Sequence, residues 1–227
     1  MQAPVLSAAD WQQIDTVLLD LDGTLLDLAF DSHFWGERIP AEWAQRRAIT
    51  LEQARAELRP RFAACEGTLE WYCIEHWSRE LQMDIRALKQ NLAHGIRWLP
   101  GAREFLQRVR TLRKRLVLVT NAHPTTLAIK DARTEVISYF DAGFSSHIFG
   151  APKEHPQFWR ELAKVERFDP ARSLFVDDSP SVLLAARDAG MRLIYAVRKP
   201  DSSVGARTHR EFPSVDSVAE LLPEGSV

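Results

Sequence analysis

Two pairs of acidic residues close apolar runs of the sequence. One pair belongs to the segment Asp20-Leu-Asp22-Gly23-Thr24, and the other is Asp177-Asp178. On a strand, positions two apart point to the same side, so Asp20 and Asp22 can face one pocket. Carboxylates gathered around one point repel one another unless a cation joins them. Because these are hard oxygen ligands without a histidine cluster, we expect Mg²⁺ rather than zinc.

A hydroxyl, an amide and an ammonium group complete this set. Thr120 and Asn121 end another apolar run, and Lys153 lies in Gly150-Ala-Pro-Lys-Glu154. A carboxylate can accept a phosphoryl group as a nucleophile. A lysine and a hydroxyl can hold the non-bridging oxygens of that group, where charge persists through the transition state. The set therefore predicts phosphoryl transfer through a covalent bond to an aspartate.

Apolar runs typical of strands buried on both faces alternate with helical periodicity. The expected strands are 16–21, 116–120, 174–177 and 193–197, with a weaker candidate at 144–149; the expected helices are 101–114, 124–138, 156–167 and 179–190. This alternation predicts a doubly wound, Rossmann-like α/β core around a parallel sheet. Ligand sites in such sheets form at the carboxyl ends of the strands, so the sheet would bring the polar residues together.

Residues 28–99 lack a buried strand and are dominated by helical pattern. Five of the seven tryptophans fall there: Trp35, Trp43, Trp71, Trp77 and Trp98. We interpret this stretch as a helical cap domain inserted after the first strand, with the core formed by 1–27 and 100–227. Its position predicts hinges near residues 27–32 and 98–101, and a motion that opens and closes the site.

Local signals place several boundaries within the insertion. Thr50-Leu-Glu-Gln53 is typical of a capping box that begins a helix, and Pro60 is expected to kink or end that helix. Asp84 is expected to cap another helix. Leu69, Cys73 and Trp77 are spaced as the apolar stripe of a single helix.

Composition excludes several classes of function. Of the 227 residues, 45% are hydrophobic and 26% charged, the formal net charge is −2, and no basic run suits nucleic acid. No secretion signal or membrane-length apolar run is present. Cys65 and Cys73 would lie about 12 Å apart on one helix, too far for a disulfide. We expect a cytoplasmic protein with reduced thiols that acts on a small molecule, without nucleic acid or membrane.

Asp-x-Asp-Gly-Thr, Thr-Asn, Lys and Asp-Asp, in this order, resemble the four signature motifs of the haloacid dehalogenase superfamily. The helical insertion resembles the cap domain of that superfamily, so the likeness covers the whole chain. The resemblance implies that Asp20 is the nucleophile, while Asp22 protonates the leaving oxygen and then activates water. It further implies a phosphate-binding set and a magnesium-binding set: Asp22, Gly23, Thr120, Asn121 and Lys153 for phosphate, and Asp20, the Asp22 backbone carbonyl, Asp177 and Asp178 for Mg²⁺.

Residues around these motifs resemble those of bacterial GMP/IMP nucleotidases. The segments concerned are 16–31, 68–73, 120–124 and 149–154. This likeness implies removal of phosphate from purine nucleoside monophosphates.

Within the acid pair, Asp178 is favoured as the direct metal ligand and Asp177 as an orienting or water-mediated one.

Four further residues are candidates for substrate specificity. Asp31 could reach the substrate from the hinge, Trp71 and Tyr72 could stack on a base, and His123 could contact a ribose or phosphate. Each also has a plainer interpretation, in packing or in backbone hydrogen bonding. Five other histidines show no metal-ligand spacing with one another and are interpreted as structural: His33, His76, His94, His147 and His155.

Three alternatives remain open at this level. The same core could serve a phosphatase for sugar phosphates or another small metabolite, or a phosphomutase. Dehalogenation is weaker, since it needs neither Asp22 nor magnesium. The third is a phospho-accepting switch or an inactive binding protein. A phospho-accepting switch also combines an aspartate, an acid pair, a threonine and a lysine, but its acid pair comes first in the chain and it lacks a helical insertion.

Overall fold

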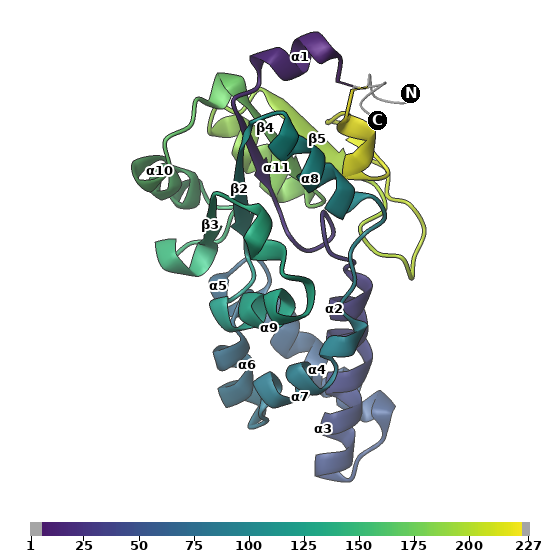
Figure 1. The fold of residues 1–227 in the computed structure, drawn as a ribbon. Helices are drawn as coiled ribbons and strands as arrows, with labels where there is room; N and C mark the ends of the chain where they lie inside the picture. The colour runs from purple at the N-terminus through teal and green to yellow at the C-terminus, as the bar shows by residue number, and fades with distance from the viewer. Residues whose placement is uncertain (1–5, 224–227) are drawn as a thin grey trace.

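The computed structural model describes residues 6–223 and has a six-stranded, wholly parallel sheet (Figure 1). The strands are β1 (Thr16–Leu19), β2 (Arg115–Thr120), β3 (Ala142–Ser145), β4 (Ser173–Asp177), β5 (Leu193–Val197) and β6 (Ser214–Val215), in the order β3-β2-β1-β4-β5-β6. β1 pairs with both β2 and β4 at the centre. The chain order thus reverses direction next to β1, and this is the point where open α/β sheets bind ligands.

Helices cover both faces of the sheet, which confirms the doubly wound α/β prediction. On one face, α8 (Ala102–Thr111) packs against a cluster that contains Val17 and Leu19 of β1. On the other, α10 (Pro156–Val165) and α11 (Pro180–Asp188) pack against Leu18. Successive residues of β1 alternate between the two layers, so a continuous apolar run is required.

Three details of the core differ from the sequence expectations. The weak strand candidate 144–149 is a strand only up to Ser145 and continues as the 3₁₀ helix η4 (Ser146–Phe149). The helix expected over 124–138 ends as α9 (Pro124–Thr134), because Glu135 adopts a left-handed φ of 55° before the 3₁₀ turn η3 (Val136–Tyr139). The short strand β6 at the sheet edge was not predicted.

The segment between β1 and α8 is helical, as expected, and lies below the sheet in Figure 1. Its elements are α2 (Ala29–His33), the π-helix η1 (Phe34–Arg38), α3 (Ile39–Arg47), α4 (Leu51–Cys65), α5 (Leu69–Tyr72), α6 (Ile74–Leu81), α7 (Ile85–Asn91) and the 3₁₀ turn η2 (Ala93–Gly95). It has an apolar cluster of its own, which includes Phe34, Trp43 and Trp77. An isolated bridge between Leu26 and Trp98 joins the two points where the chain leaves and re-enters the core. The domain boundaries at 27/28 and 99/100 stay a prediction.

The capping expectations for this helical segment (29–95) are confirmed, and two others are wrong. Thr50 and Gln53 form the capping box, and Asp84 caps α7. However, α4 continues through the exposed Pro60 to Cys65, because Leu58 and Phe62 on either side anchor it to the apolar cluster. The stripe 69–77 is not one helix, since the backbone is extended at Cys73, whose sulfur caps α6 by accepting a hydrogen bond from the His76 amide.

None of the described helices is both long and apolar enough to span a membrane.

The central strand provides a test of how the sheet is stabilised. Leu18 is fully buried in β1, whereas Leu51 begins α4 with 39% of its surface exposed. We expect Leu18→Ala to lower the free energy of unfolding by about 2–5 kcal/mol, from lost burial and the cavity left behind. The matched Leu51→Ala change should cost less than about 1 kcal/mol. Urea unfolding followed by circular dichroism measures both, and equal losses would contradict the layered packing.

Candidate active site

A cavity of about 560 Å³ lies between the carboxyl ends of the strands and the helical segment. Most of the residues singled out from the sequence line it: Asp20, Asp22, Asp31, Trp71, Tyr72, Thr120, Asn121, Lys153, Asp177 and Asp178. Gly23 and His123 are not among its lining residues. The structure therefore brings the four motifs to one place, as the sheet topology requires.

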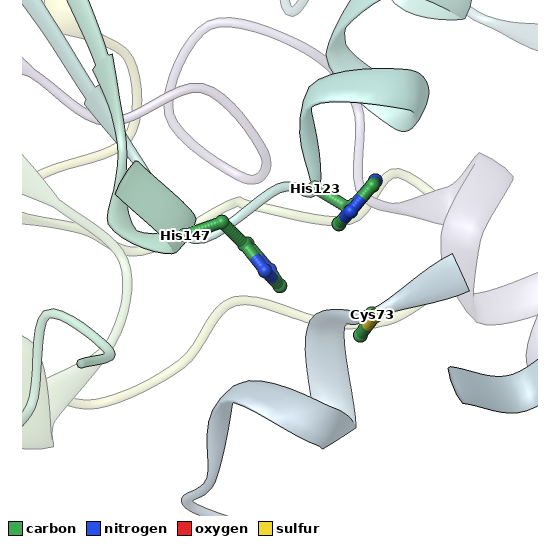
Figure 2. Close-up of side chains that lie close together, drawn as sticks. All are labelled: Cys73, His123 and His147. Carbon is green, nitrogen blue, oxygen red and sulfur yellow. The ribbon is translucent and has the colours of Figure 1, made fainter. Parts of the chain in front are cut away.

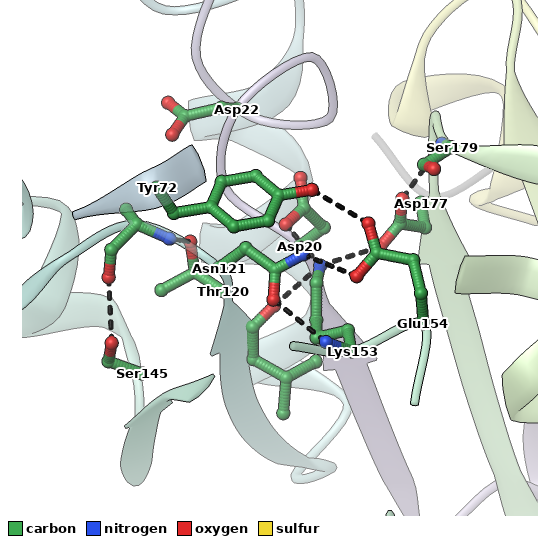
Figure 3. A network of polar contacts seen from close by, with 12 residues as sticks. Asp20, Asp22, Tyr72, Thr120, Asn121, Ser145, Lys153, Glu154, Asp177 and Ser179 are labelled. Carbon is green, nitrogen blue, oxygen red and sulfur yellow. Dashed lines mark hydrogen bonds and ion pairs between the residues drawn. The ribbon is translucent and has the colours of Figure 1, made fainter. Parts of the chain in front are cut away.

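Lys153 is the ionic centre of this site (Figure 3). Its Nζ donates to Asp20 Oδ1 at 2.5 Å, to Asp177 Oδ2 at 2.7 Å and to the Val119 carbonyl at 3.1 Å. The Lys153 side chain is only 2% exposed. Its two carboxylate partners raise its pKa against the opposing effect of burial, so the lysine remains charged.

Three buried carboxylates meet around this lysine. Asp20, Asp177 and Asp178 each place an oxygen within 4.8 Å of the other two. Burial raises the pKa of Asp20 and of Asp178 to about 7 and that of Asp177 to about 6. A site made of buried, mutually repelling oxygen ligands fits a hard divalent cation, which would favour their ionised forms.

Gly23 shapes the same site through its backbone. It adopts a φ of +87°, and a Cβ atom added there would lie 2.7 Å from Asp178 Cγ. The glycine therefore allows the loop after β1 to approach the acid pair closely.

Asp22 is paired with a different lysine from the one that contacts Asp20. β1 ends at Leu19, and the Asp22 carboxylate accepts a hydrogen bond from Lys130 of α9 at 2.5 Å. Lys130 also donates to Asp31, whose other oxygen accepts from Lys89 of α7 at 2.6 Å. Burial raises the pKa of Asp22 despite Lys130, whereas the two lysines lower the pKa of Asp31. Asp22 is thus suited to hold a proton and Asp31 to remain ionised.

Asn121 has a structural role in addition to any contact with a ligand. Its Oδ1 accepts from the Lys153 amide at 2.9 Å, and its Nδ2 donates to Glu154 Oε2 at 2.9 Å. Glu154 Oε1 in turn accepts from the Tyr72 hydroxyl at 2.7 Å. Figure 3 shows this chain of contacts linking the helical segment to Lys153. Thr120 Oγ1 accepts from the Ala122 amide at 3.0 Å and is buried next to it.

The structure adds five charged residues that sequence reasoning did not assign to the site: Glu66, Lys89, Lys130, Glu154 and Arg207. Arg207, from the loop after β5, donates to Asp178 Oδ2 at 2.7 Å. Glu154 follows the motif lysine, so its position was a usable signal. Lys89, Lys130 and Arg207 lie on separate elements, and only the fold determines their pairing with the acids.

His123 lies outside the cavity, at the start of α9. Its Nδ1 accepts from the Thr125 amide at 3.2 Å and lies 2.9 Å from Glu75 Oε2. A contact with the substrate therefore stays an untested prediction.

The family model for haloacid dehalogenase-like hydrolases matches residues 14–190. The chain belongs to this family. The match spans all four motifs and the helical segment, and the chain is a hydrolase of phosphoric monoesters. The expected resemblance is thereby confirmed.

Two curated proteins are similar to this chain in sequence, over different lengths. The chain is 37% identical over 213 residues to the GMP/IMP nucleotidase YrfG of Escherichia coli strain K12, covering 94% of this chain and 96% of that protein. It is also 31% identical over 101 residues to a glyceraldehyde 3-phosphate phosphatase of Pyrococcus abyssi, covering 44% and 42% of the two chains.

Solved structures of haloacid dehalogenase-like enzymes share the fold. A phosphatase of this family from Thermococcus onnurineus superimposes with a TM-score of 0.76 at 19% identity, covering 92% of this chain and 96% of that one. A protein described as a putative beta-phosphoglucomutase from Thermotoga maritima gives 0.64 at 19% identity, with the same coverage.

The raised pKa values of the three acids predict a pH-dependent response to Mg²⁺. Because their folded-state pKa lies above the unfolded value, the metal-free native state binds more protons and loses stability as pH rises from about 4 to about 7. Ionised carboxylates bind the cation, so Mg²⁺ should raise the melting temperature much more at about pH 8 than at about pH 5. Thermal scans with and without Mg²⁺ measure this, with Asp178→Asn as the control that loses the effect. An equal Mg²⁺ shift at both pH values would contradict it.

Proposed function

We propose that this enzyme is a Mg²⁺-dependent phosphatase of purine nucleoside 5′-monophosphates, with GMP and IMP as substrates and an aspartyl phosphate at Asp20 as intermediate. The observation that carries the proposal is the buried Asp20–Lys153–Asp177 contact at the base of an aromatic-walled cavity. Similarity along nearly the full length of a GMP/IMP nucleotidase supports the substrate class.

In the first step, an Asp20 carboxylate oxygen attacks phosphorus and the bond to the nucleoside oxygen breaks. Lys153 orients Asp20 and offsets the charge of the phosphoryl oxygens. Asp22, whose pKa is raised by burial, gives its proton to the departing nucleoside oxygen. Mg²⁺, held by Asp20, Asp178 and the Asp22 carbonyl with Asp177 orienting, would supply further neutralisation of this charge.

In the second step, water attacks the phosphorus of the aspartyl phosphate. Asp22, now ionised, takes the proton of that water, and the bond between phosphorus and Asp20 breaks to release phosphate. Lys130 donates to the Asp22 carboxylate and would orient it for this transfer. Thr120 and Asn121 remain the proposed partners of the phosphoryl oxygens.

The nucleoside would occupy the part of the cavity formed by the helical segment. Aromatic residues line that part: Trp35, Phe62, Trp71, Tyr72 and Trp77. Trp71 is 37% exposed, so its ring has surface to offer to a base. A cavity with a largely apolar wall and a charged floor suits a nucleoside monophosphate.

The test of this function is phosphate release, with Mg²⁺, from a panel of nucleoside monophosphates and sugar phosphates. We expect GMP and IMP to give the highest kcat/KM, and Asp20→Asn to reduce turnover more than about 10³-fold while the fold is retained. The matched control is Asp15→Asn, since Asp15 lies at the opposite end of β1 and pairs with Arg172 on the surface.

Other results of the panel would assign a different reaction. A preference for sugar phosphates would keep the catalytic core and reject the nucleotide. An isomerised product would indicate a phosphomutase. A phosphorylated enzyme that persists without releasing phosphate would reject hydrolysis, and full activity of Asp20→Asn would reject the covalent step.

Stacking of the base on Trp71 predicts a selective defect. In Trp71→Ala, kcat/KM for GMP should fall roughly 5- to 150-fold, which corresponds to the loss of about 1–3 kcal/mol of stacking. Ribose 5-phosphate, which has no base, serves as the internal control and should be nearly unaffected. A similar loss for both substrates would mean that Trp71 supports the cavity without contacting a base.

A further inference from the structure

A second group of potential metal ligands lies outside the cavity (Figure 2). Cys73, His123 and His147 each place a ligand atom within 4.8 Å of the other two. Cys73 comes from the junction of α5 and α6, His123 from the start of α9, and His147 from η4 after β3. His123 and His147 are 24 residues apart, and Cys73 precedes both by 50 residues or more, so only the fold brings the three together.

His147 has an unused ring nitrogen in this cluster. Its Nε2 is buried and has no hydrogen-bond partner among the described residues. A buried polar atom without a partner is costly unless a ligand satisfies it. A metal ion bound at Nε2 would satisfy this nitrogen.

Glu75 adds a carboxylate beside the same cluster. Its Oε2 lies 2.9 Å from His123 Nδ1 and 3.9 Å from Cys73 Sγ, and its Oε1 accepts from Thr125 Oγ1. His123 Nδ1 also accepts a hydrogen bond from the Thr125 amide. The neutral Nδ1–H tautomer of His123 would instead donate to Glu75 and leave the lone pair of Nε2 free for a metal ion.

We propose that Cys73, His123 and His147 bind one Zn²⁺ ion or a similar transition-metal ion, with Glu75 as the fourth ligand. A thiolate, two imidazoles and a carboxylate form a donor set that zinc accepts in tetrahedral geometry and that Mg²⁺ does not favour. Zinc bonds would have lengths of about 2.0–2.3 Å. This site is distinct from the carboxylate cluster around Lys153.

The ion would join the helical segment to the core. Cys73 and Glu75 belong to the helical segment, whereas His123 and His147 lie on the core beside β2 and β3. Cys73 also follows Tyr72, whose hydroxyl contacts Glu154 at the active site. Metal binding would therefore hold the two parts in the contact seen here and oppose any opening of the cavity.

Co²⁺, a spectroscopic substitute for zinc, tests the site without substrate. The protein is titrated with Co²⁺ in excess Mg²⁺, which occupies the carboxylate cluster. We expect one equivalent to bind with a thiolate-to-cobalt charge-transfer band and the strong visible bands of tetrahedral cobalt, and one equivalent of Zn²⁺ to abolish them. Zn²⁺ should also raise the melting temperature.

Two cysteine variants separate this site from general thiol binding. Cys73→Ser keeps an oxygen to cap α6 but should lose the charge-transfer band, and His147→Gln should weaken binding at least tenfold. Cys65→Ser is the matched control: Cys65 Sγ lies 3.6 Å from His76 Nε2 and is not part of the cluster, so the band should persist. Circular dichroism verifies that each variant is folded.

The proposal is overturned if Co²⁺ binds without the charge-transfer band, if Cys73→Ser retains it, or if the dissociation constant is weaker than about 1 mM, the range of loosely held surface ions. These measurements involve no turnover, so their failure would leave the phosphatase proposal untouched.

Discussion

The charge balance around Lys153 is the constraint on which the rest of the site depends. Asp20, Asp177 and Asp178 are all less than 9% exposed, and carboxylates removed from water must be neutralised or paired. Lys153 and Arg207 supply two positive charges, so one negative charge remains in excess when all three acids are ionised. That excess is what a divalent cation or a proton offsets. β1 and β4 are neighbours in the parallel sheet, so Asp20 and the acid pair meet at the same edge of it.

A second ionic group links the helical segment to Asp22 in the loop after β1. Lys130 lies between Asp22 and Asp31, and Asp31 is also paired with Lys89. Asp31 and Lys89 belong to α2 and α7, whereas Lys130 belongs to the core helix α9. The protonation and orientation of Asp22 therefore depend on contacts that cross from the core to the helical segment. A motion at the expected hinges would change this group directly.

The strands and the motif residues could be predicted because their signals are local. A run such as 16–19 is apolar because both of its faces are covered, and Asp20 is recognisable by what surrounds it in the chain. Lys130 and Arg207 could not be predicted, because nothing near them in sequence indicates a partner about 100 or 30 residues away. Cys73 was misassigned for a related reason. Its spacing fits an apolar stripe, but the sulfur caps a new helix and faces two histidines of the core.

The short segment 72–75 contacts both the candidate active site and the proposed metal site. Tyr72 reaches Glu154, and Glu154 is bonded to Asn121, which fixes the backbone of Lys153. In the proposed mechanism, closing the helical segment would complete the support of Lys153, which pairs with Asp20, and would exclude water from the reacting groups. Cys73 and Glu75 follow Tyr72 in the chain, and they lie beside the core histidines His123 and His147. An ion bound there would act on the same closed arrangement, which connects occupancy of a site outside the cavity to access to Asp20.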